Sequence, residues 1–336
     1  MSLSMREIAK LAGVSSATVS RVVNGSNLVT EETAKRVQKI IQDLNFVPNN
    51  SAIHLKKGKS RIFGIIIPDI TNPFFTELIR SFEGVLVEHG RELLVANTDF
   101  HSSRVQISTR RMLLRRVDGV AILASELETD MLESLVQNQI PVVTADYYRT
   151  ARGVSDIVVD FGPGMSQLIA HLKDLGHRQV GFIGGTPGLV TSRSRMEAFL
   201  DAVVRQGLTS REGWMVEGNY RIDGGSEAME KILSQPEHPT AVVTVNDLTA
   251  IGALRTAHEK NLRIPEDISI AGCDDIPMSD VVFPPLTTMR IARNEYAQKL
   301  FEALSALEEN PGQMGQQFHV RTELVPRKST GPAPSR

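Results

Sequence analysis

The 336-residue sequence predicts an α/β protein in which a small, all-helical N-terminal unit precedes a larger α/β body. Two observations support this division. Residues 1–61 show only helical periodicity, whereas from Arg61 onward apolar runs typical of strands alternate with amphipathic helical segments. The first part also has ten Lys and Arg against four Asp and Glu, although the whole chain has a formal charge of −2. A basic unit on an acidic body is typical of a nucleic-acid-binding module joined to another domain.

The N-terminal unit begins with the pattern of two helices separated by a short turn. Ile8 and Leu11 give the first helix an apolar face, Gly13 permits the turn, and Ser15 is expected to cap the second helix, on which Val19 begins an apolar stripe. This is a helix-turn-helix pattern. Its second helix would present short polar side chains and one arginine to a DNA major groove: Ser15, Ser16, Ala17, Thr18 and Arg21. The competing interpretation is a small helical bundle that never contacts DNA.

A basic segment follows the third predicted helix of this unit, which ends before Pro48. Residues 49–60 contain too little apolar sequence to form a stable helix alone, so they are interpreted as a hinge. Ala52 and Leu55 lie three residues apart and would share a face if the hinge became helical. Leu55 could instead pack beneath the body.

The body contains two successive sets of strand–helix units, which predict two doubly wound lobes with parallel sheets covered on both faces. We expect a headpiece at 1–48, the hinge, a two-lobe domain at 61–327 and a tail at 328–336. The N-lobe would comprise residues 61–160 and 291–327, with a late helix and a final strand returning to it, and the C-lobe residues 161–290. Ligands of such sheets bind beyond the carboxyl ends of the strands.

Residues 5–59 resemble the DNA-binding headpiece of the lactose-repressor/galactose-repressor family of bacterial transcription regulators. The residues that carry this resemblance include Ala12-Gly13-Val14-Ser15, Thr18-Val19-Ser20-Arg21-Val22, Asn24, Leu44-Asn45-Phe46-Val47-Pro48-Asn49, Ala52, Leu55 and Gly58-Lys59-Ser60. The resemblance implies that Asn24, Asn49 and Ala52 contribute to DNA binding. It also implies that the hinge folds on operator DNA and that Leu55 inserts into the minor groove.

The body, to about Arg327, resembles the periplasmic-sugar-binding-protein-like core of the same family, and the ribose-type members most. Thr71-Asn72-Pro73-Phe74-Phe75 resembles their ligand loop, in which the asparagine bonds a hydroxyl and two aromatic side chains sandwich a sugar ring. The pattern departs from theirs at Tyr147, where arginine is expected, and at Ile291, where glutamine is expected. The resemblance implies this effector site: Asn72, Phe74, Phe75, Asp146, Tyr147, Arg195, Asn246, Asp274 and Ile291.

Several of these side chains have ordinary structural alternatives. Asn72 could simply begin a helix, and the two phenylalanines could belong to the core. Arg193 competes with Arg195 for the ligand role, and Asp247 is expected to cap a helix. The departures at Tyr147 and Ile291 leave the effector open between another sugar, a deoxy compound and a nucleoside-like or purine ligand.

The predicted function is a homodimeric, sequence-specific transcription regulator, most simply a repressor, that binds a pseudo-palindromic operator and responds to a small polyhydroxylated effector. A two-lobe solute-binding protein is the alternative from another class. Complete hydrolase, zinc-protease and dinucleotide motifs are missing, so we do not expect an enzyme. Cys273 is the single cysteine, which excludes disulfides and cysteine metal sites, and no metal or cofactor is expected. Without an apolar spanning run or an export signal, the expected location is the cytoplasm, away from membranes.

Overall fold

The computed structural model describes residues 4–23, 26, 28–46, 59–124 and 129–335. It divides into two compact units, Met1–Arg61 and Ile62–Arg336. None of the helices in the described part of the chain has the length and apolar character needed to span a bilayer.

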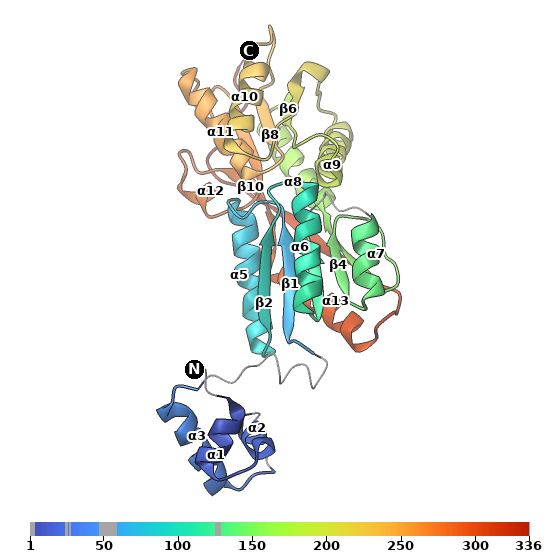
Figure 1. Cartoon of the computed structure of the whole chain (residues 1–336). Coiled ribbons are helices and arrows are strands. Elements are labelled where there is room, and N and C mark those ends of the chain that lie inside the picture. The colour runs from blue at the N-terminus through green and yellow to red at the C-terminus, as the bar shows by residue number, and fades with distance from the viewer. Residues whose placement is uncertain (1–3, 24–25, 27, 47–58, 125–128, 336) are drawn as a thin grey trace. The chain divides into compact units, whose positions relative to one another are not determined.

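The first unit is a three-helix bundle formed by α1 (Met5–Ala12), α2 (Ser16–Val23) and α3 (Glu31–Asp43) (Figure 1). Gly13 ends α1 in the left-handed region with φ 65°, a conformation that glycine adopts at little cost. One apolar prediction is wrong, because Leu11 is 61% exposed while Ala9 and Ala12 supply the buried face of α1. The bundle core is small: Ile8, Ala9, Ala12, Val19, Val22, Val37 and Phe46.

The second unit has an eleven-strand order in which all neighbouring strands are parallel except the last two in the chain. The first five strands of this order and the start of the last strand in the chain form the sheet of the N-lobe. The last five strands of the order form the sheet of the C-lobe. In spatial order the strands are β2 (Glu92–Asn97), β1 (Ile62–Ile67), β3 (Gly119–Ile122), β4 (Val142–Ala145), β5 (Val154–Asp160), β11 (Gln317–Val325), β10 (Thr287–Ile291), β9 (Ser269–Asp274), β8 (Ala241–Thr244), β6 (Val180–Ile183) and β7 (Met215–Val216).

Helices cover both sheets (Figure 1). The N-lobe has α5 (Pro73–Glu88), α6 (Ser102–Arg115), α7 (Thr129–Gln137) and α13 (Arg293–Glu309); the C-lobe has α8 (Phe161–Asp174), α9 (Val190–Gln206), α10 (Ile222–Leu233), α11 (Asp247–Glu259) and the short α12 (Met278–Val281). The α13 helix packs on α5, so this late helix belongs to the N-lobe as predicted.

The final strand joins the two lobes. Residues 317–321 of β11 pair in parallel with β5, and residues 322–325 pair antiparallel with β10. The apolar pattern of the sequence predicts the return of this strand to the first lobe, but it does not predict β5. Ser155, Asp156 and Asp160 interrupt the apolar run of β5, and Asp156 is nevertheless fully buried because Thr144 and the Tyr147 and Tyr148 backbones donate hydrogen bonds to it.

The expected tail is an integral part of the C-lobe. Ser329 is fully buried and bonds to the Ile270 carbonyl oxygen and the Thr287 N–H, at 2.6 and 2.8 Å. The Ala333 N–H donates to the Leu175 carbonyl oxygen. These bonds correct the interpretation of residues 328–336 as a separate tail, which relied on their Pro-rich composition alone.

Candidate functional site

The helix-turn-helix presents the start of α2 to solvent. Ser15 caps this helix as predicted, because its hydroxyl oxygen accepts the Thr18 N–H at 3.1 Å. Ser16, Ala17 and Arg21 are exposed, whereas Val19 on the other side of the helix is completely buried. The α2 helix therefore has a polar outer face with small side chains at its first turn and a guanidinium one turn later. That arrangement permits close approach to base edges.

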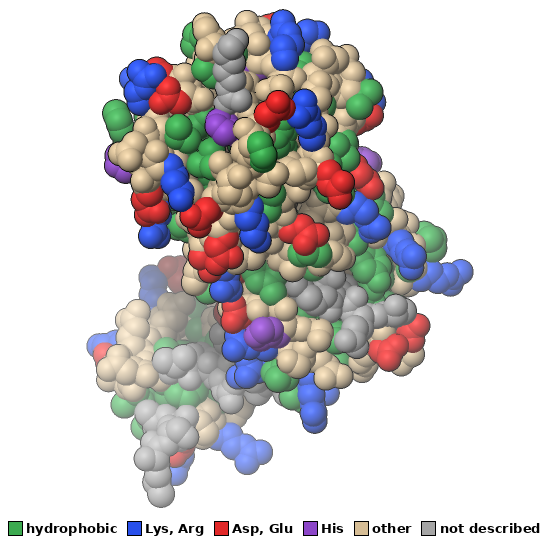
Figure 2. All heavy atoms as spheres, turned by 90° about the horizontal axis from the view of Figure 1, so that it is seen from above, with side chains coloured by type: hydrophobic (Ala, Val, Ile, Leu, Met, Phe, Trp, Pro, Cys, Tyr) green, Lys and Arg blue, Asp and Glu red, His purple; other side chains and the backbone are tan. Residues whose placement is uncertain are grey.

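The remaining predicted DNA contacts, Asn24, Asn49, Ala52 and Leu55, lie outside the described residues. On the face of the molecule seen in Figure 2, basic and acidic side chains of the body are mixed rather than separated by sign. Such a mixed surface is not the one-signed patch expected for nucleic acid. The excess of basic over acidic residues lies in residues 1–61 of the sequence.

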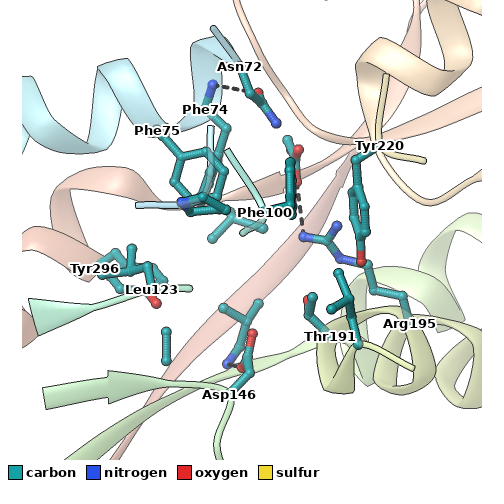
Figure 3. Close-up of a pocket in the computed structure, with 16 residues that line it drawn as sticks. Asn72, Phe74, Phe75, Phe100, Leu123, Asp146, Thr191, Arg195, Tyr220 and Tyr296 are labelled. Atoms are coloured by element: carbon teal, nitrogen blue, oxygen red, sulfur yellow. Dashed lines mark hydrogen bonds and ion pairs between the residues drawn. The ribbon is translucent and has the colours of Figure 1, made fainter. Parts of the chain in front are cut away.

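The body contains a pocket between its lobes (Figure 3). Its empty volume is about 680 Å³, which includes space open to solvent. Loops after β1, β2 and β4 contribute from the N-lobe, and the start of α9, the loop after β7 and the end of β9 contribute from the C-lobe. This is the strand-end position predicted for a ligand site. Seven of the nine predicted effector residues line it: Asn72, Phe74, Phe75, Asp146, Arg195, Asp274 and Ile291.

Asn72 and the two phenylalanines combine a structural role with a place in the pocket wall. The side-chain oxygen of Asn72 accepts the Phe74 N–H at 3.0 Å and caps α5, which leaves the amide nitrogen for other partners. The rings of Phe74 and Phe75 meet edge to face, with centroids 5.2 Å apart and planes at 79°. They therefore cannot hold a flat ring between them, which corrects the expected sandwich.

Asp146 projects into the pocket from the loop after β4. Its φ of 52° turns the chain sharply, and one carboxylate oxygen accepts the Val159 N–H at 2.8 Å. Burial raises the pKa of Asp146 to about 7, although the Val159 hydrogen bond and the charge of Arg195 oppose this shift. The Asp146 side chain is thus only partly accessible to water.

Arg195 and Asp274 form a buried ion pair at the opposite wall. Arg195 Nη2 lies 3.3 Å from Asp274 Oδ1, and Nη1 donates to the Val245 carbonyl oxygen at 3.1 Å. The guanidinium lies over the rings of Phe161 and Tyr220, but its buried Nε has no hydrogen-bond partner among the described residues. Burial is the largest single effect and lowers the pKa of Arg195, but the charges of Asp274, Cys273, Tyr220 and Asp146 together outweigh it, so the net shift is upward. An unused N–H at a pocket wall is a suitable donor to a ligand oxygen.

The Asp274 backbone is strained and held by several partners. Asp274 and Asp275 both have positive φ, 114° and 57°, which is costly for residues with a Cβ atom. Arg293 donates to both of their carbonyl oxygens and pairs with Glu77 of the N-lobe at 2.6 Å. The Asp275 carboxylate pairs with Arg290 and Arg327, so its role is structural. Burial raises the pKa of Asp274 to about 6, with Arg195 and Arg293 opposing.

Two predicted effector residues do not line this pocket. The side chain of Asn246 is fully buried, where it caps α11 by accepting the Thr249 N–H and donates to the Tyr220 carbonyl oxygen. Asn246, rather than Asp247, is thus the cap; Asp247 accepts bonds from the Thr288 and Ser279 hydroxyls and the Ile276 N–H. Tyr147 points into a second cavity, together with Arg193. Arg195, not Arg193, is therefore the pocket arginine.

Sequence reasoning missed three aromatic members of the pocket. Phe100 and Tyr220 lie in loops beyond β2 and β7, with rings nearly parallel at 16° and centroids 6.4 Å apart across the pocket (Figure 3). Tyr296 lies on the inner face of α13. Ligand sites lie beyond the carboxyl ends of the strands, and this rule selects Phe100 and Tyr220 when it includes aromatic as well as polar residues. Tyr296 follows a helical core pattern that gives no such signal.

A helix-turn-helix unit and a two-lobed body with a ligand pocket define the class of ligand-responsive DNA-binding proteins. Residues 4–49 match the model of "Bacterial regulatory proteins, lacI family", and residues 169–330 match that of a periplasmic binding protein-like domain. The HTH-type transcriptional repressor PurR of Pasteurella multocida is 34% identical over 331 residues, covering 97% of this chain and 98% of that protein. The ribose operon repressor of Escherichia coli K12 is 32% identical over 327 residues, with 97% and 99% covered.

A solved structure extends the likeness to the whole fold. The lac repressor dimer bound to operator and the anti-inducer ONPF superposes with a TM-score of 0.86 and 25% identity, covering 98% of this chain and 100% of that one. This chain belongs to the lacI family of bacterial regulatory proteins. It is a DNA-binding transcription regulator.

Proposed function

We propose that the chain acts as a homodimeric repressor whose α2 helix reads a pseudo-palindromic operator and whose interlobe pocket binds a small polyhydroxylated effector. One observation carries the effector proposal: charged side chains from both lobes line one pocket that also has aromatic walls. Asp146 contributes from the N-lobe, and Arg195 and Asp274 from the C-lobe. A polyol needs such charged hydrogen-bonding partners for its hydroxyls and an apolar surface for its C–H face.

Because the pocket lies between the two lobes, a bound effector can change how the lobes are arranged. Arg221 of the C-lobe pairs with Asp99 and Asp69 of the N-lobe, at 2.8 and 3.7 Å, beside the Phe100–Tyr220 ring contact. These contacts hold the lobes together at one side of the pocket. A ligand that contacts both lobes favours the arrangement in which both contacts form, and only such differential affinity can alter DNA binding.

A nucleoside-like effector is the second candidate. The nearly parallel rings of Phe100 and Tyr220 favour a ligand with a flat, apolar portion. Hydroxyls of an attached sugar would then meet the charged wall formed by Arg195 and Asp274.

Thermal unfolding with a panel of neutral sugars, deoxy sugars and nucleosides tests the effector proposal. A ligand at about one hundred times its Kd should stabilise the native protein by about 2.7 kcal/mol. The Asp274→Asn variant should lose most of this stabilisation because its wall no longer offers a charged acceptor. Equal stabilisation of the variant by the same compound would place the binding site elsewhere.

Ribose itself should bind weakly, because Ile291 presents a buried apolar side chain to the pocket. A hydroxyl left against Ile291 without a partner costs about 1–3 kcal/mol. The Ile291→Gln variant is therefore expected to bind D-ribose about tenfold more tightly than the parent protein, whereas Ile291→Leu should not. Calorimetric titration measures both. Tight ribose binding by the parent, unchanged in Ile291→Gln, would contradict this assignment.

A further inference from the structure

The charges around the pocket are balanced except at one position. Asp274 pairs with Arg195, Asp275 with Arg290 and Arg327, and Glu77 with Arg293. At the rim, Asp69 and Asp99 pair with Arg221. Of the two carboxylates that line the pocket within the described part of the chain, Asp146 is the one without an ion-pair partner.

The surroundings of Asp146 provide one hydrogen-bond donor and one more distant positive charge. The Val159 N–H is its one hydrogen-bond donor among the described residues, and it binds a single carboxylate oxygen. A second buried carboxylate, Asp156, lies close enough to raise its pKa further, whereas Arg195 is the cation that acts on it from a distance. Asp156 is satisfied by a hydroxyl and two backbone N–H groups. Asp146 therefore keeps acceptor capacity for a ligand, and no cation within the described part of the chain is in contact with its carboxylate.

Aromatic side chains complete this environment. Phe74, Phe75, Phe100 and Tyr296 line the pocket on the N-lobe side with Asp146, as Figure 3 shows. Aromatic faces attract cations, and a buried carboxylate without a counterion is costly until a cation or several donors reach it. This combination favours a positively charged group over a neutral hydroxyl.

We propose that the natural effector carries a protonated amine that binds Asp146, so that it is an amino sugar or another aminated polyol. The inference rests on the proposed polyol pocket and names the class of polyol. Arg195 and Asp274, already paired, are left to recognise hydroxyl groups at the opposite wall. The amine supplies the missing counterion and up to three N–H donors, where a hydroxyl supplies one.

Matched ligand pairs test this proposal with the full chain. D-glucosamine and D-galactosamine are compared with D-glucose and D-galactose by calorimetric titration at about pH 7, with the N-acetyl derivatives as uncharged controls. At least one aminated sugar should bind about tenfold more tightly than its hydroxyl counterpart, and N-acetylation should remove this advantage. Each pair isolates the effect of the amine on the Kd, because the two sugars of a pair have the same remaining hydroxyl groups.

Asp146→Asn is the critical variant. Asparagine tolerates the left-handed backbone and retains an oxygen for the Val159 N–H, so the fold should persist, which thermal unfolding checks. It should bind both members of a pair with Kd values within about threefold of each other. Asp274→Asn serves as the control and should weaken both members while preserving the preference for the amine.

The two proposals fail differently. Neutral sugars that bind as well as their aminated counterparts, or a preference that survives Asp146→Asn, would overturn the amine assignment and leave the polyol pocket intact. Binding of nucleosides alone would overturn the amine assignment and favour the nucleoside-like effector for the same pocket. The absence of binding by any aminated sugar counts against the amine assignment.

Discussion

Replacing Arg195 with methionine is expected to abolish effector binding and to lower the free energy of unfolding by about 3–5 kcal/mol, the usual cost of breaking a buried ion pair from one side. Arg195 is 7% exposed, and its loss leaves the Asp274 carboxylate buried with only Arg293 near it. Methionine fills much of the volume between Phe161 and Tyr220, so loss of charge should dominate over loss of packing. Urea unfolding and ligand titration measure the two effects.

The double variant Arg195→Met/Asp274→Asn separates stability from binding. Neutralising Asp274 removes the unpaired charge, so most of the lost stability should return, whereas effector binding should remain absent. The stability of Arg195→Met should also improve at lower pH. Burial already raises the pKa of Asp274 above that of an unfolded aspartate, and protonation between about pH 7 and 4 then favours the native state. Retained effector binding in the double variant would remove Arg195 from the site.

Replacing Arg21 with alanine should weaken operator binding by about 1–3 kcal/mol and relax sequence preference at one base pair of each half-site. The exposed guanidinium of Arg21 lies one turn beyond the capped start of α2, where a side chain can reach a guanine edge. Binding to duplexes selected from random sequence, measured by fluorescence anisotropy, gives both affinity and preference.

Lys39→Ala provides the matched control for Arg21. Lys39 is an exposed cation on α3 of the same unit, so its removal changes charge without changing α2. It should reduce binding to all duplexes alike and lower the salt dependence slightly. If Arg21→Ala behaves in this same uniform way, Arg21 contacts phosphate and does not read a base.

Much of the fold is predictable because periodicity and apolar runs report local structure. The strand at Ile62–Ile67 and the capped helix after Ser15 are such cases. The strand at Val154–Asp160 escapes prediction since its buried Asp156 is satisfied by donors from the preceding strand and turn, at Thr144 and Tyr148. The burial of Ser329 likewise depends on partners about sixty residues earlier. Tertiary hydrogen bonds of this kind leave no pattern in the local sequence.

The pocket shows the same limit. The strand-end rule and the family resemblance together placed Asp146, Arg195 and Asp274 in one site, and the structure brings all three to it. The rule and the resemblance are wrong for Asn246, whose side chain turns inward to cap α11, and for Tyr147, which points to another cavity. Neighbouring residues on a tight turn point in different directions, and the direction follows from backbone angles that sequence alone does not specify.

Operator affinity with and without bound effector tests most directly whether the interlobe pocket controls the headpiece. The compound that stabilises the protein most in the thermal panel is added at saturation to the parent protein and to Asp274→Asn, and the Kd for the selected operator is measured in each case. A coupling of about 1–3 kcal/mol should change the Kd of the parent protein by about 5- to 150-fold in one direction, with little change in the variant. An unchanged operator Kd at full occupancy of the parent protein, or an equal change in Asp274→Asn, would contradict control through this pocket.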